Sequence, residues 1–297
     1  MTTTGGAGPA AGPATARVAA IFDSVAQVYD QVGVAWFTPI AQALVAQVAP
    51  RPGERALDVG CGRGAATVAL AEAVGPTGAV TAVDISPRMV ELLRADLAAP
   101  GADGQHDGQH DGRAPVEVAV GDAAAPQLPA RSFDVVVASL VLFFLPDPGA
   151  ALAAWRELLV PGGRLGVSTF GPRDAAWEEL DDVFTPYLPP AMLDARTSGE
   201  KGPFSSDAGV EALLTGAGFG RARTVTTVAE VTVETPQRWE AWCRSHGQSA
   251  MWRAVPADAL DAVRAEAYAR LERARGEDGL FHLSQQVRLT LAEAPAS

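Results

Sequence analysis

Three glycines at alternate positions follow a short apolar run, and this spacing is typical of a loop that receives a ligand. Gly60, Gly62 and Gly64 let the backbone take positive φ and leave no Cβ in the ligand's way. The helical run that follows points its free N–H groups at this turn. Asp58 would repel a diphosphate but accept an ammonium, so we expect an adenosylmethionine-like ligand. With Ala65, the spacing also satisfies the relaxed dinucleotide fingerprint, so a nicotinamide cofactor remains an alternative.

Two further acids follow the next two predicted strands. Asp84 ends the apolar run 78–84, where a doubly wound sheet presents a carboxylate to ribose hydroxyls. Asp122 follows the run 116–120 and could accept a hydrogen bond from an adenine amino group. The carboxyl ends of parallel strands meet at one edge of a sheet, so these acids and Asp58 predict a single crevice.

An ordered set of motifs across residues 18–171 resembles the class I S-adenosylmethionine-dependent methyltransferases. Within that family, it is most similar to the small-molecule branch that includes the ubiquinone and menaquinone biosynthesis methyltransferases. The motifs are Phe22–Asp30, Leu57–Gly64, Val83–Ser86, Gly121–Ala123, Phe133–Val136 and Leu159–Gly163.

The resemblance implies S-adenosylmethionine as cofactor and S-adenosylhomocysteine as its product. The cofactor-binding residues it implies are Tyr29, Asp58, Gly60, Gly62, Asp84, Ile85, Asp122, Ala123 and Ser139. Gly60 and Gly62 would approach the methionine moiety, Tyr29 would close over its carboxylate, and Ser139 would present its backbone to the cleft. The family often carries His or Asn near residues 140–144, but this chain has only apolar side chains there.

Repeated strand–helix units predict an α/β fold with a doubly wound, seven-stranded, Rossmann-like sheet, mostly parallel with an antiparallel C-terminal strand. After a first strand from Arg55, we expect strands at 78–84, 116–120, 133–138, 164–170, 223–233 and 281–293. We expect helices at 87–97, 148–159 and 207–215, and a turn at 161–163. Residues 17–297 would form one domain with its cofactor-binding core at 18–171, preceded by a disordered tail at 1–16.

Two helical insertions, at 172–206 and 235–279, are predicted to form lids over the substrate. The second contains Trp239, Trp242 and Trp252, and ends in an amphipathic helix over 260–274. Such aromatic residues could line a flat apolar pocket. The alternative is that these helices only add a layer over the sheet or form a homodimer contact.

Methyl transfer requires an aligned nucleophile, and a base only when that nucleophile is a protonated hydroxyl. His246 is the first candidate for this base, followed by Tyr187 and Glu178. A carbon nucleophile would instead require an aromatic pocket that stabilises a cation. The sequence does not choose between O- and C-methylation.

Composition excludes several classes of function. The net charge of −12 opposes binding to nucleic acid. Two cysteines give neither a disulfide framework nor zinc-ligand spacing, and no apolar run is long enough for a membrane span, so we expect a cytoplasmic protein. The His-Asp pairs of the glycine-rich loop at 104–112 could suggest a metal site, but ordering such a loop is costly, so no metal is expected.

These observations favour methyl transfer from S-adenosylmethionine to a small-molecule acceptor, such as a secondary metabolite or a quinone-like or isoprenoid-like compound. One alternative is a protein that binds adenosylmethionine but uses the cleft for a non-methylating reaction such as cyclisation. A nicotinamide oxidoreductase is disfavoured by Asp58 and by the antiparallel C-terminal strand pair.

Overall fold

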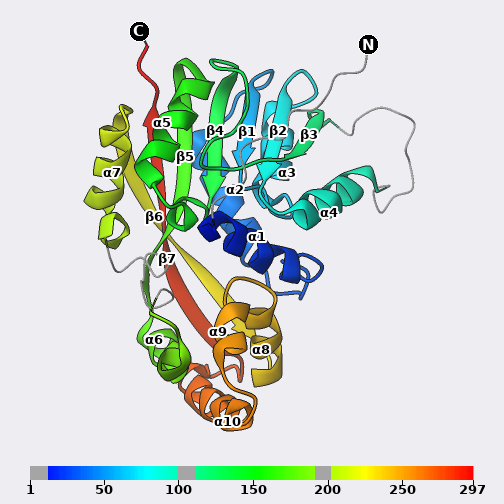
Figure 1. Cartoon of the computed structure of the whole chain (residues 1–297), viewed down its shortest axis with the longest axis vertical. Helices are drawn as coiled ribbons and strands as arrows, with labels where there is room; N and C mark the ends of the chain where they lie inside the picture. Colours follow the sequence, from blue (N-terminus) through cyan, green and yellow to red (C-terminus); the bar gives the residue numbers. More distant parts are fainter. Residues whose placement is uncertain (1–12, 100–111, 191–201, 297) are drawn as a thin grey trace.

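The computed structural model describes residues 13–99, 112–190 and 202–296, and their strands form one seven-stranded sheet. The strand order is β3-β2-β1-β4-β5-β7-β6, with β7 antiparallel to both of its neighbours and the other pairs parallel (Figure 1). The predicted fold class is therefore confirmed. The strands are β1 (Arg55–Val59), β2 (Ala79–Asp84), β3 (Val116–Val120), β4 (Phe133–Ser139), β5 (Leu159–Arg173), β6 (Gly220–Val233) and β7 (Phe281–Glu293).

Helices cover both faces of this sheet. Figure 1 shows α5 and α7 on one face and α2 and α3 on the other. The helices that flank the sheet are α2 (Phe37–Val48), α3 (Ala65–Val74), α4 (Pro87–Ala98), α5 (Pro148–Leu158) and α7 (Asp207–Gly216). As predicted, α4 begins at a proline, and the Ser86 hydroxyl accepts a hydrogen bond from the Met89 N–H as its N-cap.

The last strands are much longer than the first ones and project past the carboxyl edge of β1–β4. β6 and β7 have 14 and 13 residues, whereas β1 has 5. The pairing of β7 with β5 ends at Gln285, so β6 is the one strand of the sheet that pairs with residues 281–284. This two-stranded ribbon carries a group of helices beyond the sheet (Figure 1).

The two predicted insertions form one helical layer on that ribbon. Helix α6 (Ala175–Asp181) and the 3-10 helix η2 (Asp182–Tyr187) come from the first insertion. They contact helices of the second, which are α8 (Pro236–Arg244), α9 (Ser249–Ala254) and α10 (Leu260–Leu271). One continuous hydrophobic cluster includes core residues of the sheet and of this layer, so the layer is packed firmly onto the sheet.

Three elements start three or more residues before their predicted positions. Helix α1 (Pro13–Val25) begins inside the segment expected to be a disordered tail, because Pro13 is a favourable first residue and the helix packs against α4 at the carboxyl edge of the sheet (Figure 1). Strand β5 begins at Leu159 and not at 164, because Leu159 pairs with Phe133 of β4 before a register shift, after which Arg164 pairs with Val135. Strand β6 begins at Gly220, three residues before the predicted start. The loop with the His-Asp pairs lies outside the described residues.

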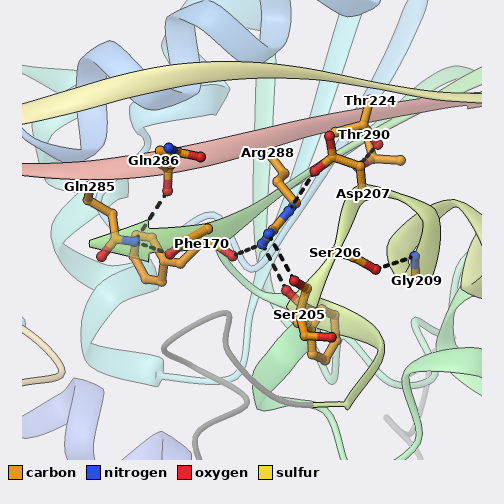
Figure 2. Close-up of polar contacts among 12 residues, drawn as sticks. Phe170, Ser205, Ser206, Asp207, Gly209, Thr224, Gln285, Gln286, Arg288 and Thr290 are labelled. Carbon is orange, nitrogen blue, oxygen red and sulfur yellow. Dashed lines mark hydrogen bonds and ion pairs between the residues drawn. The ribbon is translucent and has the colours of Figure 1, made fainter. Parts of the chain in front are cut away.

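A buried guanidinium fixes the chain where it returns from the first insertion to the sheet. Arg288 of β7 donates from Nε to Asp207 Oδ1 (2.8 Å) and from Nη1 to the carbonyls of Phe170 (2.6 Å) and Phe204 (2.8 Å) (Figure 2). A longer contact of 3.3 Å reaches the carbonyl of Ser205, so one side chain joins β5, β7, the 3-10 helix η4 (Gly202–Ser205) and the start of α7.

No helix among the described residues combines the length and the apolar character needed to cross a bilayer.

We expect Arg288→Met to lower the free energy of unfolding by about 3 kcal/mol, because it leaves buried carbonyls and Asp207 without their donor. Urea denaturation followed by circular dichroism measures this change. Arg221→Met is the matched control. Arg221 of β6 pairs with Glu293 of β7, but the Arg221 side chain is 79% exposed. We expect that control to change stability by no more than about 0.5 kcal/mol. Equal changes in the free energy of unfolding in the two variants would show that the hydrogen bonds of Arg288 do not stabilise this junction.

Candidate active site

Two adjoining hollows lie at the carboxyl edge of the sheet, and they share the lining residues Tyr29, Gly60, Gly62 and Ser139. Counted together with the open space at their mouths, the larger hollow spans about 700 Å³ and the smaller one about 390 Å³. All nine residues predicted to bind the cofactor line one hollow or both. The larger hollow adds Asp84, Ile85, Asp122 and Ala123 to the shared four, and the smaller one adds Asp58.

The glycine turn after β1 is built as its spacing predicted. Gly60, Gly62 and Gly64 have φ values of 75°, 51° and 90°, a region that only glycine adopts readily. A Cβ at Gly60 would overlap the side chain of Val141, while a Cβ at Gly62 would meet Tyr29 at 3.8 Å. The turn is tied to β2, because the Gly60 N–H donates to the Val83 carbonyl (2.7 Å). The backbone of this turn therefore borders the hollows directly.

The Asp84 carboxylate joins two turns at this edge. Its Oδ2 accepts from the Gly62 N–H and its Oδ1 from the Ser86 N–H, each at 2.8 Å. Burial raises the pKa of this carboxyl, while those two hydrogen bonds oppose the rise. Each oxygen has a second lone pair, which could accept from a ligand hydroxyl.

Asp122 and Ala123 follow β3 and form the next part of the wall. Asp122 Oδ1 accepts from the Ala124 N–H (2.8 Å), which fixes the carboxylate within its own turn. The indole N–H of the buried Trp155, on α5, donates to the Ala123 carbonyl (2.7 Å). A helix behind the sheet thus anchors this part of the wall.

Asp58 lies at the base of the smaller hollow and is almost fully buried. Thr67 of α3 donates from Oγ1 to Asp58 Oδ2 (2.6 Å). Burial, together with the nearby Asp84 charge, raises the pKa of Asp58 to about 7, although the Thr67 hydrogen bond opposes the rise. A cation bound here would stabilise the ionised form.

Tyr29 lies over the glycine turn in a stack of aromatic rings. It stacks on Phe37 with ring centroids 4.5 Å apart, and the Phe22 ring meets it edge-on at 6.1 Å. Phe22 and Phe37 come from α1 and α2, so both N-terminal helices position Tyr29. Burial raises the pKa of its phenol, which keeps it protonated and able to donate.

Six residues that line the smaller hollow were not predicted as site residues, and three of them have charged or aromatic side chains: Asp30, Phe37 and Arg63. Asp30 has a positive φ of 55° and accepts from the Thr38 hydroxyl (2.9 Å). Asp30 directly follows Tyr29 and ends the Phe22–Asp30 motif, and this position could have identified it as a site residue. Arg63 donates to the Ala26 carbonyl (2.9 Å) and pairs with Asp96, so its guanidinium holds α1 and α4 together.

Acidic side chains dominate the charge of the two hollows. Asp30, Asp58, Asp84 and Asp122 line them, and Arg63 is the one Lys or Arg among the described lining residues. Such a set favours a cationic ligand.

The three candidate bases do not converge on these hollows. His246 lies between Phe37 and Trp242, with ring centroids 5.6 Å and 4.6 Å away, and its Nδ1 donates to the Trp242 carbonyl (2.7 Å). Burial lowers its pKa to about 4, so the imidazole is neutral at pH 7. Glu178 is exposed on α6, because helix periodicity turns the neighbouring Trp177 inward instead. Tyr187 packs half-buried at the end of η2.

The tryptophans of the helical layer fill its core. Trp239, Trp242 and Trp252 are each no more than 2% exposed, and none lines either hollow. Trp242 packs against Trp36 and Trp177 with ring centroids 5.6 Å and 5.7 Å away. The apolar wall of the larger hollow comes instead from α1 and the segment after β4. Its members are Val18, Phe22, Val141, Phe144, Leu145 and Pro146.

Comparison with known proteins identifies relatives over most of the chain. Residues 57–167 match the family model described as a methyltransferase domain. The nocamycin O-methyltransferase of Saccharothrix syringae is 35% identical over 256 residues, which are 83% of this chain and 88% of that protein. The aklanonic acid methyltransferase DauC of Streptomyces sp. (strain C5) is 38% identical over 178 residues, or 60% of this chain and 76% of that protein.

Solved structures share the fold at lower sequence identity. The crystal structure of the [4+2]-cyclase SpnF matches with a TM-score of 0.55 and 19% identity, covering 96% of this chain and 98% of that one. At this identity, the likeness shows a common fold and nothing about the reaction.

We expect Asp84→Asn to weaken S-adenosylmethionine binding by about 10-fold or more, because it removes a charged acceptor and disturbs two turns. Isothermal titration calorimetry measures the affinity. Asp134→Asn is the matched control, since Asp134 lies at the start of β4, far from the hollows, and likewise accepts from a backbone N–H, that of Arg55. Unchanged affinity in Asp84→Asn would remove Asp84 from the site.

We expect S-adenosylmethionine affinity to fall as the pH is lowered from 7.5 to 5.5, because Asp58, with its pKa raised to about 7, takes up a proton and loses its attraction for a cation. Asp58→Asn should bind more weakly at pH 7.5 and show a smaller pH dependence. Calorimetric titrations at both pH values test this. A variant with the same pH dependence as the wild type would show that Asp58 does not face the ligand's charge.

Proposed function

The chain belongs to the class I S-adenosylmethionine-dependent methyltransferases, and on that premise we propose that it methylates an acidic oxygen of an apolar small molecule. The observation that carries this proposal is an acidic crevice beside an apolar wall, with no histidine or lysine among its described lining residues. Family membership favours methyl transfer over a non-methylating reaction in the same cleft.

The geometry of the crevice fits the cofactor. The turn at Gly60 and Gly62 leaves backbone in place of side chains where a ligand must approach closely. Asp84 would hold the ribose hydroxyls, and Asp122 would accept from the adenine amino group. Ile85 and Ala123 would pack against the adenosine moiety. When bound, S-adenosylmethionine supplies a methyl group on a positively charged sulfur.

The smaller hollow would receive the amino-acid end of the cofactor. Asp58 and Asp30 would attract its ammonium, and both have pKa values raised mainly by burial, so a bound cation would stabilise their ionised forms. Tyr29 and Ser139 line both hollows, at the junction of the two ends. The remaining task of the protein is to exclude water and align the acceptor with the methyl group.

The acceptor would lie against the apolar wall formed by α1 and the residues after β4. Phe22 and Phe144 meet edge-on there, with ring centroids 5.4 Å apart, and Leu145 and Pro146 extend the surface. A wall of this kind suits an apolar acceptor skeleton.

An acceptor that ionises on its own would need no protein base. His246 is separated from the glycine turn by the Phe37 and Tyr29 rings, and its lowered pKa makes it a weak base. A carboxylic acid or an acidic enol or phenol is already deprotonated, or nearly so, at neutral pH. The names of the two relatives, an O-methyltransferase and a methyltransferase of an acid, support the same acceptor chemistry. We therefore favour O-methylation over C-methylation, in specialised metabolism.

A transfer assay tests this function. Purified protein is incubated with S-adenosylmethionine labelled in its methyl group and a panel of apolar carboxylic acids, acidic phenols and enols, each beside its O-methylated form. We expect labelled product from free acids and not from the blocked compounds. His246→Asn should then lower kcat on the preferred acceptor by less than about 10-fold, whereas loss of a general base costs about 100-fold or more.

Two results would contradict the proposal. Label bound to carbon, and therefore stable to hydrolysis and ether cleavage, would show C-methylation. A 100-fold loss in His246→Asn, with unchanged cofactor affinity, would assign His246 as the base.

A further inference from the structure

Two serines lie side by side where β4 and β5 reach the hollows. Ser139 and Ser168 are register partners, and their Oγ atoms are 3.1 Å apart. Ser168 is completely buried and lines neither hollow, whereas Ser139 is half-buried and lines both. The pair therefore connects the interior of the sheet with the place where the hollows meet.

Ser168 also holds a strained residue. Leu140 has a positive φ of 59°, which is unfavourable for a leucine, and its N–H donates to Ser168 Oγ at 2.9 Å. The same N–H is 3.2 Å from the Ser168 carbonyl oxygen. This turn places Val141 against Gly60. Ser168 thus fixes the positions of Leu140 and Val141. These two residues line the larger hollow, whereas Ser168 does not.

The direction of the hydrogen bond between the serines follows from burial. Ser168 Oγ accepts from Leu140, and Ser139 is the neighbour within reach of its own hydrogen among the contacts of the described residues. If Ser139 donated instead, the Ser168 hydrogen would be buried without an acceptor, at a cost of about 1–3 kcal/mol. Ser168 therefore donates to Ser139, and the Ser139 hydrogen is left to face the hollows.

A hydroxyl that must donate selects a particular part of the ligand. Its hydrogen cannot pair with an ammonium, which has no lone pair, although the second lone pair of the Ser139 oxygen could accept from one. The cofactor's amino-acid end also carries a carboxylate, which would lie near Asp30 and Asp58 and so requires donors around it. Three of the five N–H groups of Arg63 already pair with Asp96 and the Ala26 carbonyl, which hold its guanidinium toward α1 and α4. Ser139 Oγ–H is a donor in the right place.

We propose that the Ser139 hydroxyl donates to the carboxylate at the amino-acid end of the cofactor, and that Ser168 is the positioning residue that orients it. The proposal rests on the proposed function, because it assigns one more contact in the same site. It gives Ser139 a side-chain role in addition to the backbone role that the family resemblance implied.

Calorimetry with two ligands tests this assignment. S-adenosylhomocysteine carries the amino-acid end, and 5′-methylthioadenosine lacks it. We expect Ser139→Ala to weaken S-adenosylhomocysteine binding by about 10-fold or more, since a hydrogen bond to a charged group is lost, and to leave 5′-methylthioadenosine within about 2-fold. Ser139→Cys, a weak donor of similar size, should fall between the wild type and Ser139→Ala.

Ser168→Ala should also weaken S-adenosylhomocysteine more than 5′-methylthioadenosine. The double variant Ser139→Ala/Ser168→Ala should show the same difference between the two binding affinities as Ser139→Ala alone, because both changes act through one hydroxyl. Thr224→Ala is the matched control. It disrupts a similar hydroxyl pair between strands, Thr224 of the edge strand β6 and Thr290 of β7, whose oxygens are 3.0 Å apart and which line neither hollow (Figure 2). It should leave both affinities unchanged.

Distinct outcomes overturn the proposal. Equal weakening of both ligands in Ser139→Ala would indicate a structural effect on the turn. If Ser139→Ala bound both ligands as the wild type does but transferred methyl groups more slowly, the hydroxyl would contact the methyl acceptor instead of the cofactor. In these two cases the proposed function stands. A wild-type protein that binds neither ligand would overturn the proposed function together with this inference.

Discussion

The carboxylate of Asp84 is the contact on which the crevice depends. It accepts backbone hydrogen bonds from the glycine turn after β1 and from the turn that begins α4, so it connects two segments that the sheet only brings near each other. Because the group is buried, its charge is held in place by those N–H donors and by whatever cation or hydroxyl enters the hollow. The same interaction that shapes the turn thereby creates an acidic site for a ligand.

Around that contact, acidic and apolar side chains line different parts of the crevice. Four carboxylates face the end of the sheet where the cofactor would lie, and aromatic and aliphatic residues of α1 and the segment after β4 face the remaining side. A hydroxyl pair between β4 and β5 links the two regions. Under the proposed function, the protein would contribute alignment, exclusion of water and electrostatic attraction, and the acidity of the acceptor would replace a catalytic base.

The helical layer acts on the site through packing. Its tryptophans fill a core that continues into the sheet, and the ribbon of β6 and β7 carries this core past the carboxyl edge. His246, at the boundary, supports Phe37, and Phe37 in turn stacks on Tyr29 over the glycine turn. The layer thereby stiffens one wall of the crevice. Arg288 performs the corresponding task where the chain re-enters the sheet.

The sequence, through the family resemblance of its motifs, named nine cofactor-binding candidates, and the structure brings them to one edge of the sheet. By itself it determined the sheet and the glycine turn, because these depend on local patterns. Examples are a glycine spacing that permits positive φ, an acid that ends a buried strand, and a proline after a capping serine. It failed where contacts between distant segments decide the outcome. Residues 13–16 are helical because α1 packs against α4 at the sheet edge, the tryptophans fill a core because two insertions pack together, and His246 is neutral because rings from α2 and α8 bury it. Nor could the sequence show that Ser168 faces Ser139, since strand register is set by long-range pairing between β4 and β5. Burial and hydrogen-bond direction are properties of such assembled neighbours, and only the tertiary structure brings those neighbours together.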